Sequence, residues 1–260
     1  MYIMKKKIVV FDVDETLGYF TQLGVFCDCL DKYFNDEEYA NKHFNEILEL
    51  CPEFIRPKLL QILEYLKNKK KEKKCYKIMI YTNNQGPKIW VENLKDYFDH
   101  KLNYKLFDQI IAAFKVRGEK VEIGRTSHDK SVDDFFRCTQ LPPDVEICFI
   151  DDLFHPKMED EKVYYINVKP YHHHLSFSTF LLRFVNSKLG KKIKNKEDFI
   201  KEMNNSYKFN EDMKNKKEQD IDEIVGKKMF QHIKQFFYEN NDQSLKHKKK
   251  KSKHRSVRRK

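Results

Sequence analysis

Three short apolar runs, each followed at once by a polar residue, dominate the pattern along this chain. They occupy residues 8–11 before Asp12, 78–81 before Thr82 and 147–150 before Asp151. Unbroken hydrophobicity is typical of parallel strands that are covered on both faces of a sheet. Residues 110–114 and 163–168 are two further strand candidates.

Apolar residues at helical spacing lie between and after these runs. They predict helices over residues 59–66, which follow Pro57, and over residues 89–98 and 176–185. Helices that alternate with buried strands predict an α/β fold with a doubly wound, Rossmann-like parallel sheet. Ligands of such sheets bind beyond the carboxyl ends of the strands, so we expect the three polar strand ends to converge.

The composition changes after residue 186, where Lys, Asn, Asp and Glu become frequent. We therefore predict a main domain over residues 1–186, a charged helical extension over 187–243 and a basic disordered tail over 244–260. Apolar residues between Ile221 and Phe237 keep helical spacing and predict an amphipathic helix. Packing of this helix on the same domain is favoured over binding to a partner.

The net charge of +11 is concentrated at one end of the sequence. The segment from Lys246 to Lys260 holds ten Lys or Arg residues and no acid, so ten of the eleven net charges lie there. Basicity is thus a property of the tail, which we expect to bind nucleic acid or another polyanion.

Hydropathy and cysteine usage exclude several classes of protein. No apolar run approaches the length of a membrane span, and residues 1–11 lack the long apolar core of a secretory signal. We therefore expect an intracellular protein of the nucleus or cytoplasm, neither secreted nor membrane-bound. The six cysteines form no Cys-x-x-Cys pair, which argues against a zinc site and a disulfide framework.

The first strand end carries two acids with one residue between them. Asp12 and Asp14 can point to the same side, and paired carboxylates attract a hard divalent cation such as Mg²⁺. In this interpretation Asp12 attacks phosphorus as a nucleophile and Asp14 exchanges protons with the leaving group and water. Thr16 would orient the loop that carries both acids.

Three later segments supply the remaining groups that phosphoryl transfer needs. Thr82 and Asn83 offer neutral donors to phosphate oxygens. Asp151 and Asp152 are candidate metal ligands beside Asp12 and Asp14. A lysine must offset the repulsion between nucleophile and phosphate, and Lys130 is preferred for this role, with Lys115 as the rival candidate.

With these four segments in order, the sequence resembles the phosphatases of the haloacid-dehalogenase superfamily. Residues 12–16, Asp-Val-Asp-Glu-Thr, are similar to the superfamily's nucleophile motif. Residues 54–60 and the segment after Lys130 resemble the family that acts on the carboxy-terminal domain of RNA polymerase II (NLI-interacting-factor-like), in the version found in large DNA viruses. The resemblance covers about residues 5–186 and implies an aspartyl-phosphate mechanism, Mg²⁺ and a phosphoserine or phosphothreonine protein substrate.

The same residues leave two alternatives open. The stretch Thr82-Asn83-Asn84-Gln85-Gly86 is also similar to the corresponding motif of nucleic-acid 3′-phosphatases, although Glu15 stands where those enzymes usually have glycine. An inactive binding module with the same fold is the other alternative. The short segments between the motifs predict that no large cap domain covers the site, and an open site would accept a segment of a macromolecule.

Overall fold

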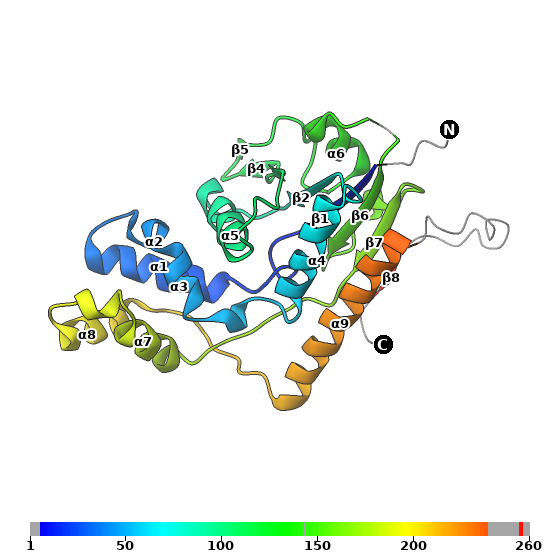
Figure 1. Cartoon of the computed structure of the whole chain (residues 1–260). Helices are drawn as coiled ribbons and strands as arrows, with labels where there is room; N and C mark the ends of the chain where they lie inside the picture. The colour runs from blue at the N-terminus through cyan, green and yellow to red at the C-terminus, as the bar shows by residue number, and fades with distance from the viewer. Residues whose placement is uncertain (1–5, 143, 239–254, 257–260) are drawn as a thin grey trace.

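A parallel sheet forms the centre of the computed structural model, which describes residues 6–142, 144–238 and 255–256 (Figure 1). The strand order is β3-β2-β1-β6-β7-β8, and all of these neighbours pair in parallel. The strands are β1 (Lys7–Phe11), β2 (Lys77–Tyr81), β3 (Gln109–Ile111), β6 (Glu146–Asp151), β7 (Val163–Asn167) and β8 (Arg255–Ser256). The predicted α/β class and the three apolar strands are confirmed.

The strand predicted over residues 110–114 is shorter in the structure. β3 ends at Ile111, and the chain then turns into an antiparallel hairpin of β4 (Lys115–Val116) and β5 (Glu119–Lys120). Residues 112–114 therefore lead out of the sheet instead of extending it.

Helices cover both faces of the sheet because successive strand side chains point to opposite sides. Val9 and Phe11 share one hydrophobic cluster with α4 (Leu59–Lys71), α5 (Lys88–Lys101) and α9 (Lys216–Tyr238). Ile8 and Val10 face the other side, where Phe135 of α6 (Val132–Thr139) packs. Figure 1 shows α4 and α9 in front of the sheet and α6 behind it. The sheet is thus doubly wound.

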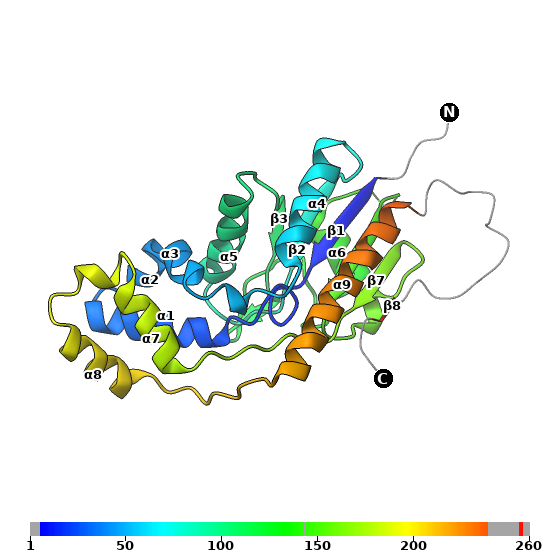
Figure 2. The same ribbon diagram turned by 60° about the horizontal axis from the view of Figure 1, so that its bottom comes forward.

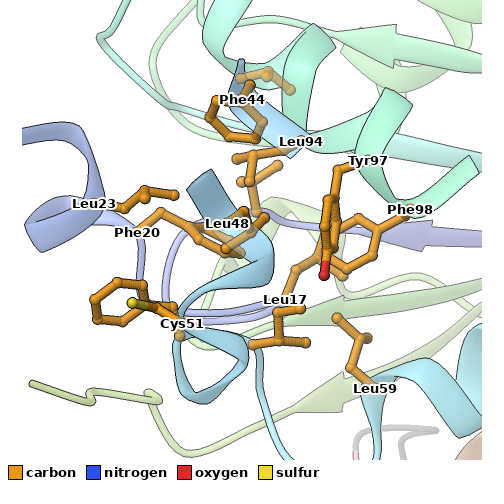
Figure 3. Packing of buried hydrophobic residues seen from close by; sticks show 14 of the residues in the cluster. Leu17, Phe20, Leu23, Phe44, Leu48, Cys51, Leu59, Leu94, Tyr97 and Phe98 are labelled. Atoms are coloured by element: carbon orange, nitrogen blue, oxygen red, sulfur yellow. The ribbon is translucent and has the colours of Figure 1, made fainter. Parts of the chain in front are cut away.

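A lobe of short helices lies beside the sheet (Figures 1 and 2). It contains α1 (Thr21–Phe34), α2 (Tyr39–Lys42), α3 (Phe44–Glu49), α7 (Phe177–Asn186) and α8 (Lys196–Ser206). Phe26 of α1 stacks on Phe180 of α7 with ring centroids 3.9 Å apart. Figure 3 shows Phe44 and Leu48 of the lobe packing near Leu94 of α5, so the lobe and the sheet domain share one core.

Three 3₁₀ turns complete the secondary structure of the described main chain around these helices. They are η1 (Pro52–Phe54), η2 (Pro156–Met158) and η3 (Gly190–Lys192). Among the described residues, no helix is both long and apolar enough to cross a membrane.

The extension packs on the main domain. Met229 and Ile233 of α9 are fully buried in the same cluster as β1 and α4, and so are Phe199 and Met203 of α8. A Cβ atom at Gly226 would lie 2.2 Å from the carbonyl oxygen of Pro57, so glycine is required where α9 approaches the start of α4. The expected docking of the amphipathic helix on its own domain is confirmed. Most of the predicted disordered tail lies outside the described residues.

Candidate functional site

Two neighbouring strands bring Asp12 and Asp151 together. β1 and β6 pair in parallel with Phe11 opposite Ile150, and the Asp12 amide donates to the Ile150 carbonyl oxygen at 2.9 Å. The chain winds from β1 toward β3 on one side and from β6 toward β7 on the other. The two acids therefore lie at the point where the strand order reverses, which is the usual ligand crevice of such sheets.

Three carboxylates form a buried group at this point. Asp12, Asp151 and Asp152 each offer an oxygen atom, and these oxygens lie within 4.8 Å of one another. The expectation that Asp12 and Asp151 come close enough to share one ion is met. Asp14, which the sequence suggests as a further metal ligand, is not part of this group.

Lys130 lies between the two strand-end acids. Its Nζ atom is 2.5 Å from Asp12 Oδ1 and 2.7 Å from Asp151 Oδ2, and the residue is 1% exposed. It directly precedes Ser131, whose hydroxyl caps α6 by accepting from the Asp134 amide. The rival Lys115 lies on the β4 strand of the hairpin, with its Nζ over the Phe114 ring.

The electrostatics of the group favour a further cation. Burial raises the pKa of Asp12 well above its usual value, Asp151 and Asp14 raise it further, and Lys130 opposes the shift. Burial and the neighbouring Asp151 raise the pKa of Asp152 to about 6. Asp151 differs, because Lys130 and His155 outweigh the burial that would raise its pKa and hold it low. One ammonium group thus faces three buried carboxylates, and this excess of oxygen ligands fits a hard divalent cation.

Thr16 holds Asp152 in place. The Thr16 hydroxyl donates to Asp152 Oδ1 at 3.1 Å and accepts from the Asp152 amide at 3.0 Å. The orienting role of Thr16 stays a prediction, and its side chain contacts Asp152. The buried Arg56 guanidinium fixes the same loop, because it donates to the carbonyl oxygens of Thr16, Glu15 and Lys169.

The loop after β2 lies on the other side of the acids. Asn84 Nδ2 donates to Asp14 Oδ2 at 2.8 Å, and the Asn84 amide donates to Thr82 Oγ1 at 3.0 Å. Asn83 Oδ1 is buried and has no hydrogen-bond partner among the described residues. Burial raises the pKa of Asp14, and the hydrogen bond from Asn84 counteracts part of that shift.

Sequence reasoning missed three supporting residues. Arg125 is fully buried, donates to the carbonyl oxygens of Thr82, Ala112 and His128, and so ties three loops together. Asn84 stands in the stretch Thr82–Gly86, and the sequence did not indicate its hydrogen bond to Asp14. His155 Nε2 lies 3.3 Å from Asp151 Oδ2. Every residue has a backbone carbonyl group, so the sequence does not show which carbonyl oxygens accept from Arg125. An arginine between apolar segments is the one sign of such a contact that the sequence offers.

Comparison with protein-family models, curated proteins and solved structures found no match to this chain. The fold and site define a Rossmann-like α/β protein with a buried group of three carboxylates and one lysine at the carboxyl end of its sheet. The resemblance to haloacid-dehalogenase phosphatases stays a prediction.

Proposed function

We propose that this protein is a Mg²⁺-dependent phosphomonoester hydrolase that forms an aspartyl-phosphate on Asp12. The observation that carries the proposal is the position of Lys130 between Asp12 and Asp151, with Asp152 in the same buried group. A nucleophilic carboxylate needs cations around it before it can approach a phosphate dianion. The site combines a lysine with a set of oxygen ligands for one more cation.

The oxygens of Asp12, Asp151 and Asp152 would hold Mg²⁺. When bound, Mg²⁺ supplies positive charge that offsets the charge on the phosphate oxygens. Thr16 fixes the Asp152 carboxylate for this purpose through its paired hydrogen bonds. Lys130 occupies Asp12 Oδ1, and no hydrogen bond from the described residues reaches Asp12 Oδ2.

The chain's own groups can carry out both half-reactions. In the first, an Asp12 oxygen forms a bond to phosphorus, the ester P–O bond breaks, and Asp14 gives its proton to the departing alkoxide. In the second, water attacks phosphorus, Asp14 takes the proton from that water, and inorganic phosphate leaves Asp12. Burial of Asp14 favours its protonated form, which suits the first step.

Donors for the phosphate oxygens come from the loop after β2 and from Lys130. The Thr82 hydroxyl accepts from the Asn84 amide, and its own proton can point to a phosphate oxygen. Arg125 holds the backbone of Thr82 from behind. Asn83 is the second neutral donor in this proposal.

The proposed substrate is a protein phosphoserine or phosphothreonine. This choice depends on the motifs at residues 54–60 and 130–135, which resemble the polymerase-tail phosphatases. Turnover should be measured on phosphoserine, phosphothreonine and phosphotyrosine peptides, nucleotides and a 3′-phosphorylated oligonucleotide, each with Mg²⁺ and with EDTA. Mg²⁺-dependent release of phosphate from the first two peptides supports the proposal. Exclusive turnover of the oligonucleotide, or no turnover at all, contradicts it.

A further inference from the structure

A groove leads away from Asp14 between the helical lobe and the start of α5. It has a volume of about 450 Å³, and its walls come from α1, α2 and the loop that precedes α5. Figure 2 shows α1 and α2 beside α5. Asp14 and Asn84 line the groove at the end near the candidate active site. A chain segment attached to a phosphorylated residue would therefore have this groove next to it.

Three acids give the groove a negative charge. Asp28, Asp31 and Glu37 line it, and no ion pair within the described parts of the chain includes any of the three. Burial raises the pKa of Asp31, and the carboxylates of Asp28 and Glu37 add to the shift. The nearby Lys42 is already paired with two acids outside the lining, Asp36 and Glu38.

Aromatic side chains line the same groove. Trp90 lines the groove, and Phe44 packs against it edge-on with ring centroids 5.2 Å apart. No Lys or Arg of the described chain lies over the Trp90 ring in a cation–π contact. Indole faces attract ammonium and guanidinium groups more strongly than other side-chain rings do. Carboxylates and an indole in one groove suit a Lys or Arg side chain.

We propose that this groove binds a Lys or Arg side chain of the substrate, so that the preferred substrates are phosphopeptides with basic residues close to the phosphorylated position. The inference rests on the proposed phosphatase function and adds a substrate class to it. Charge complementarity favours this occupant, because an acidic peptide or a nucleic-acid strand would be repelled by the carboxylates of Asp28, Asp31 and Glu37.

The first test compares three phosphoserine peptides that differ only in their flanking residues, which are Lys and Arg, Ala, or Glu. We expect kcat/KM to be about 10-fold higher for the basic than for the acidic peptide at low salt. The ratio should fall toward one as salt screens the charges. The basic tail would favour the acidic peptide, so it works against the expected result. Equal turnover of all three peptides overturns the inference and leaves the phosphatase proposal standing.

Variants assign the effect to the groove. Asp28→Asn combined with Glu37→Gln removes two exposed carboxylates, and we expect the ratio between basic and acidic peptide to fall about 5-fold. Asp31 is left intact because its Oδ1 accepts from the Ala40 amide and supports the start of α2. The matched control is Glu38→Gln combined with Glu46→Gln, two exposed acids of the same lobe outside the lining. An equal fall in the control overturns the assignment.

A binding measurement separates the two proposals. Trp90 is the only tryptophan of the chain, so tryptophan fluorescence, excited at a wavelength that the 14 tyrosines do not absorb, reports on this groove. An unphosphorylated Lys- and Arg-rich peptide should change the fluorescence of the full-length protein, and the Glu-rich peptide should not. This result without any phosphatase activity would remove the proposed function and keep the groove. No response to the basic peptide, or a larger response to an oligonucleotide, overturns the inference.

Discussion

Lys130 Nζ lies 2.5 Å from Asp12 Oδ1, although 118 positions separate the two residues in the chain. The same Nζ lies 2.7 Å from Asp151 Oδ2, so one ammonium group joins the end of β1 to the end of β6. All three residues are buried. Burial lowers the pKa of a lysine, but Asp12 and Asp151 outweigh that effect and raise the pKa of Lys130. The lysine is therefore charged, and its charge stabilises the ionised forms of Asp12 and Asp151.

Replacement of the nucleophile should stop the reaction. Asp12→Asn keeps the shape of the side chain but removes the oxygen charge that attacks phosphorus, so we expect turnover to fall below detection. The ion pair between Lys130 and Asp151 remains, so the protein should stay folded by circular dichroism. Full activity of Asp12→Asn would exclude the aspartyl-phosphate mechanism.

Removal of the lysine should destabilise the protein as well as inactivate it. Lys130→Ala leaves two buried carboxylates without their cation, which costs about 3–5 kcal/mol of unfolding free energy. Urea unfolding measures the loss, and Mg²⁺ should restore part of it by binding the same carboxylates. Lys115→Ala is the matched control, because this half-buried lysine has no ion pair within the described chain. Comparable losses in both variants would argue against the central position of Lys130.

The metal-free protein should lose stability as the pH rises from about 4 to about 6. Asp152 has a pKa of about 6 in the folded protein against an ordinary value of 3.8, so the folded state binds more protons in this window. Stability is then highest below the window and falls through it, by about 2 kcal/mol for this one group. Unfolding in EDTA at several pH values measures the slope. In Asp152→Asn the slope should correspond to about one bound proton fewer in the folded state. An unchanged slope would contradict the raised pKa of Asp152.

Thr16 should act through Asp152 on the metal. Thr16→Val keeps the shape but removes both hydrogen bonds to Asp152, and we expect Mg²⁺ to bind about 10-fold more weakly. The Mg²⁺ dependence of turnover and of the melting temperature measures the change. Thr16→Ser retains the hydroxyl and should bind Mg²⁺ as the unmodified protein does. Equal Mg²⁺ affinity in Thr16→Val would mean that Asp152 is not a ligand.

The extension should behave as part of the main domain. Ile233→Ala in α9 removes a fully buried side chain from the shared core and should cost about 2–4 kcal/mol. Ile224→Ala in the same helix is the control, because Ile224 is 44% exposed and should cost less than about 0.5 kcal/mol. Thermal or urea unfolding compares the two variants. A negligible cost at Ile233 would show that α9 is dispensable for the fold.

The sequence predicted those features that depend on a local pattern of residues, such as buried strands and the start of a helix. Residues 8–11 and 147–150 are apolar because both of their faces are buried, so strand ends could be located and the acids that follow them could be grouped. Lys130 could be chosen because it directly precedes a capped helix. These features depend on neighbours in the chain.

Long-range contacts explain what the sequence did not reveal. The apolar spacing of residues 221–237 predicted the docking of α9, but the charged composition after residue 187 did not indicate that Phe199 and Met203 of α8 are buried in the same core. The spacing of Asp12 and Asp14 gave no sign that the Asp14 carboxylate accepts a hydrogen bond from Asn84, 70 positions away. Arg56 and Arg125 donate hydrogen bonds to backbone carbonyl oxygens. Because every residue has such an oxygen, the sequence does not identify these partners.

A crystal structure with Mg²⁺ and beryllium fluoride would show whether Asp12 is the nucleophile, because beryllium fluoride mimics a phosphoryl group on a carboxylate. We expect beryllium fluoride bonded to an Asp12 oxygen, with Mg²⁺ held between Asp12 and the acids at the end of β6, Asp151 and Asp152. A complex that leaves Asp12 unmodified, or that holds Mg²⁺ away from Asp151, would contradict it.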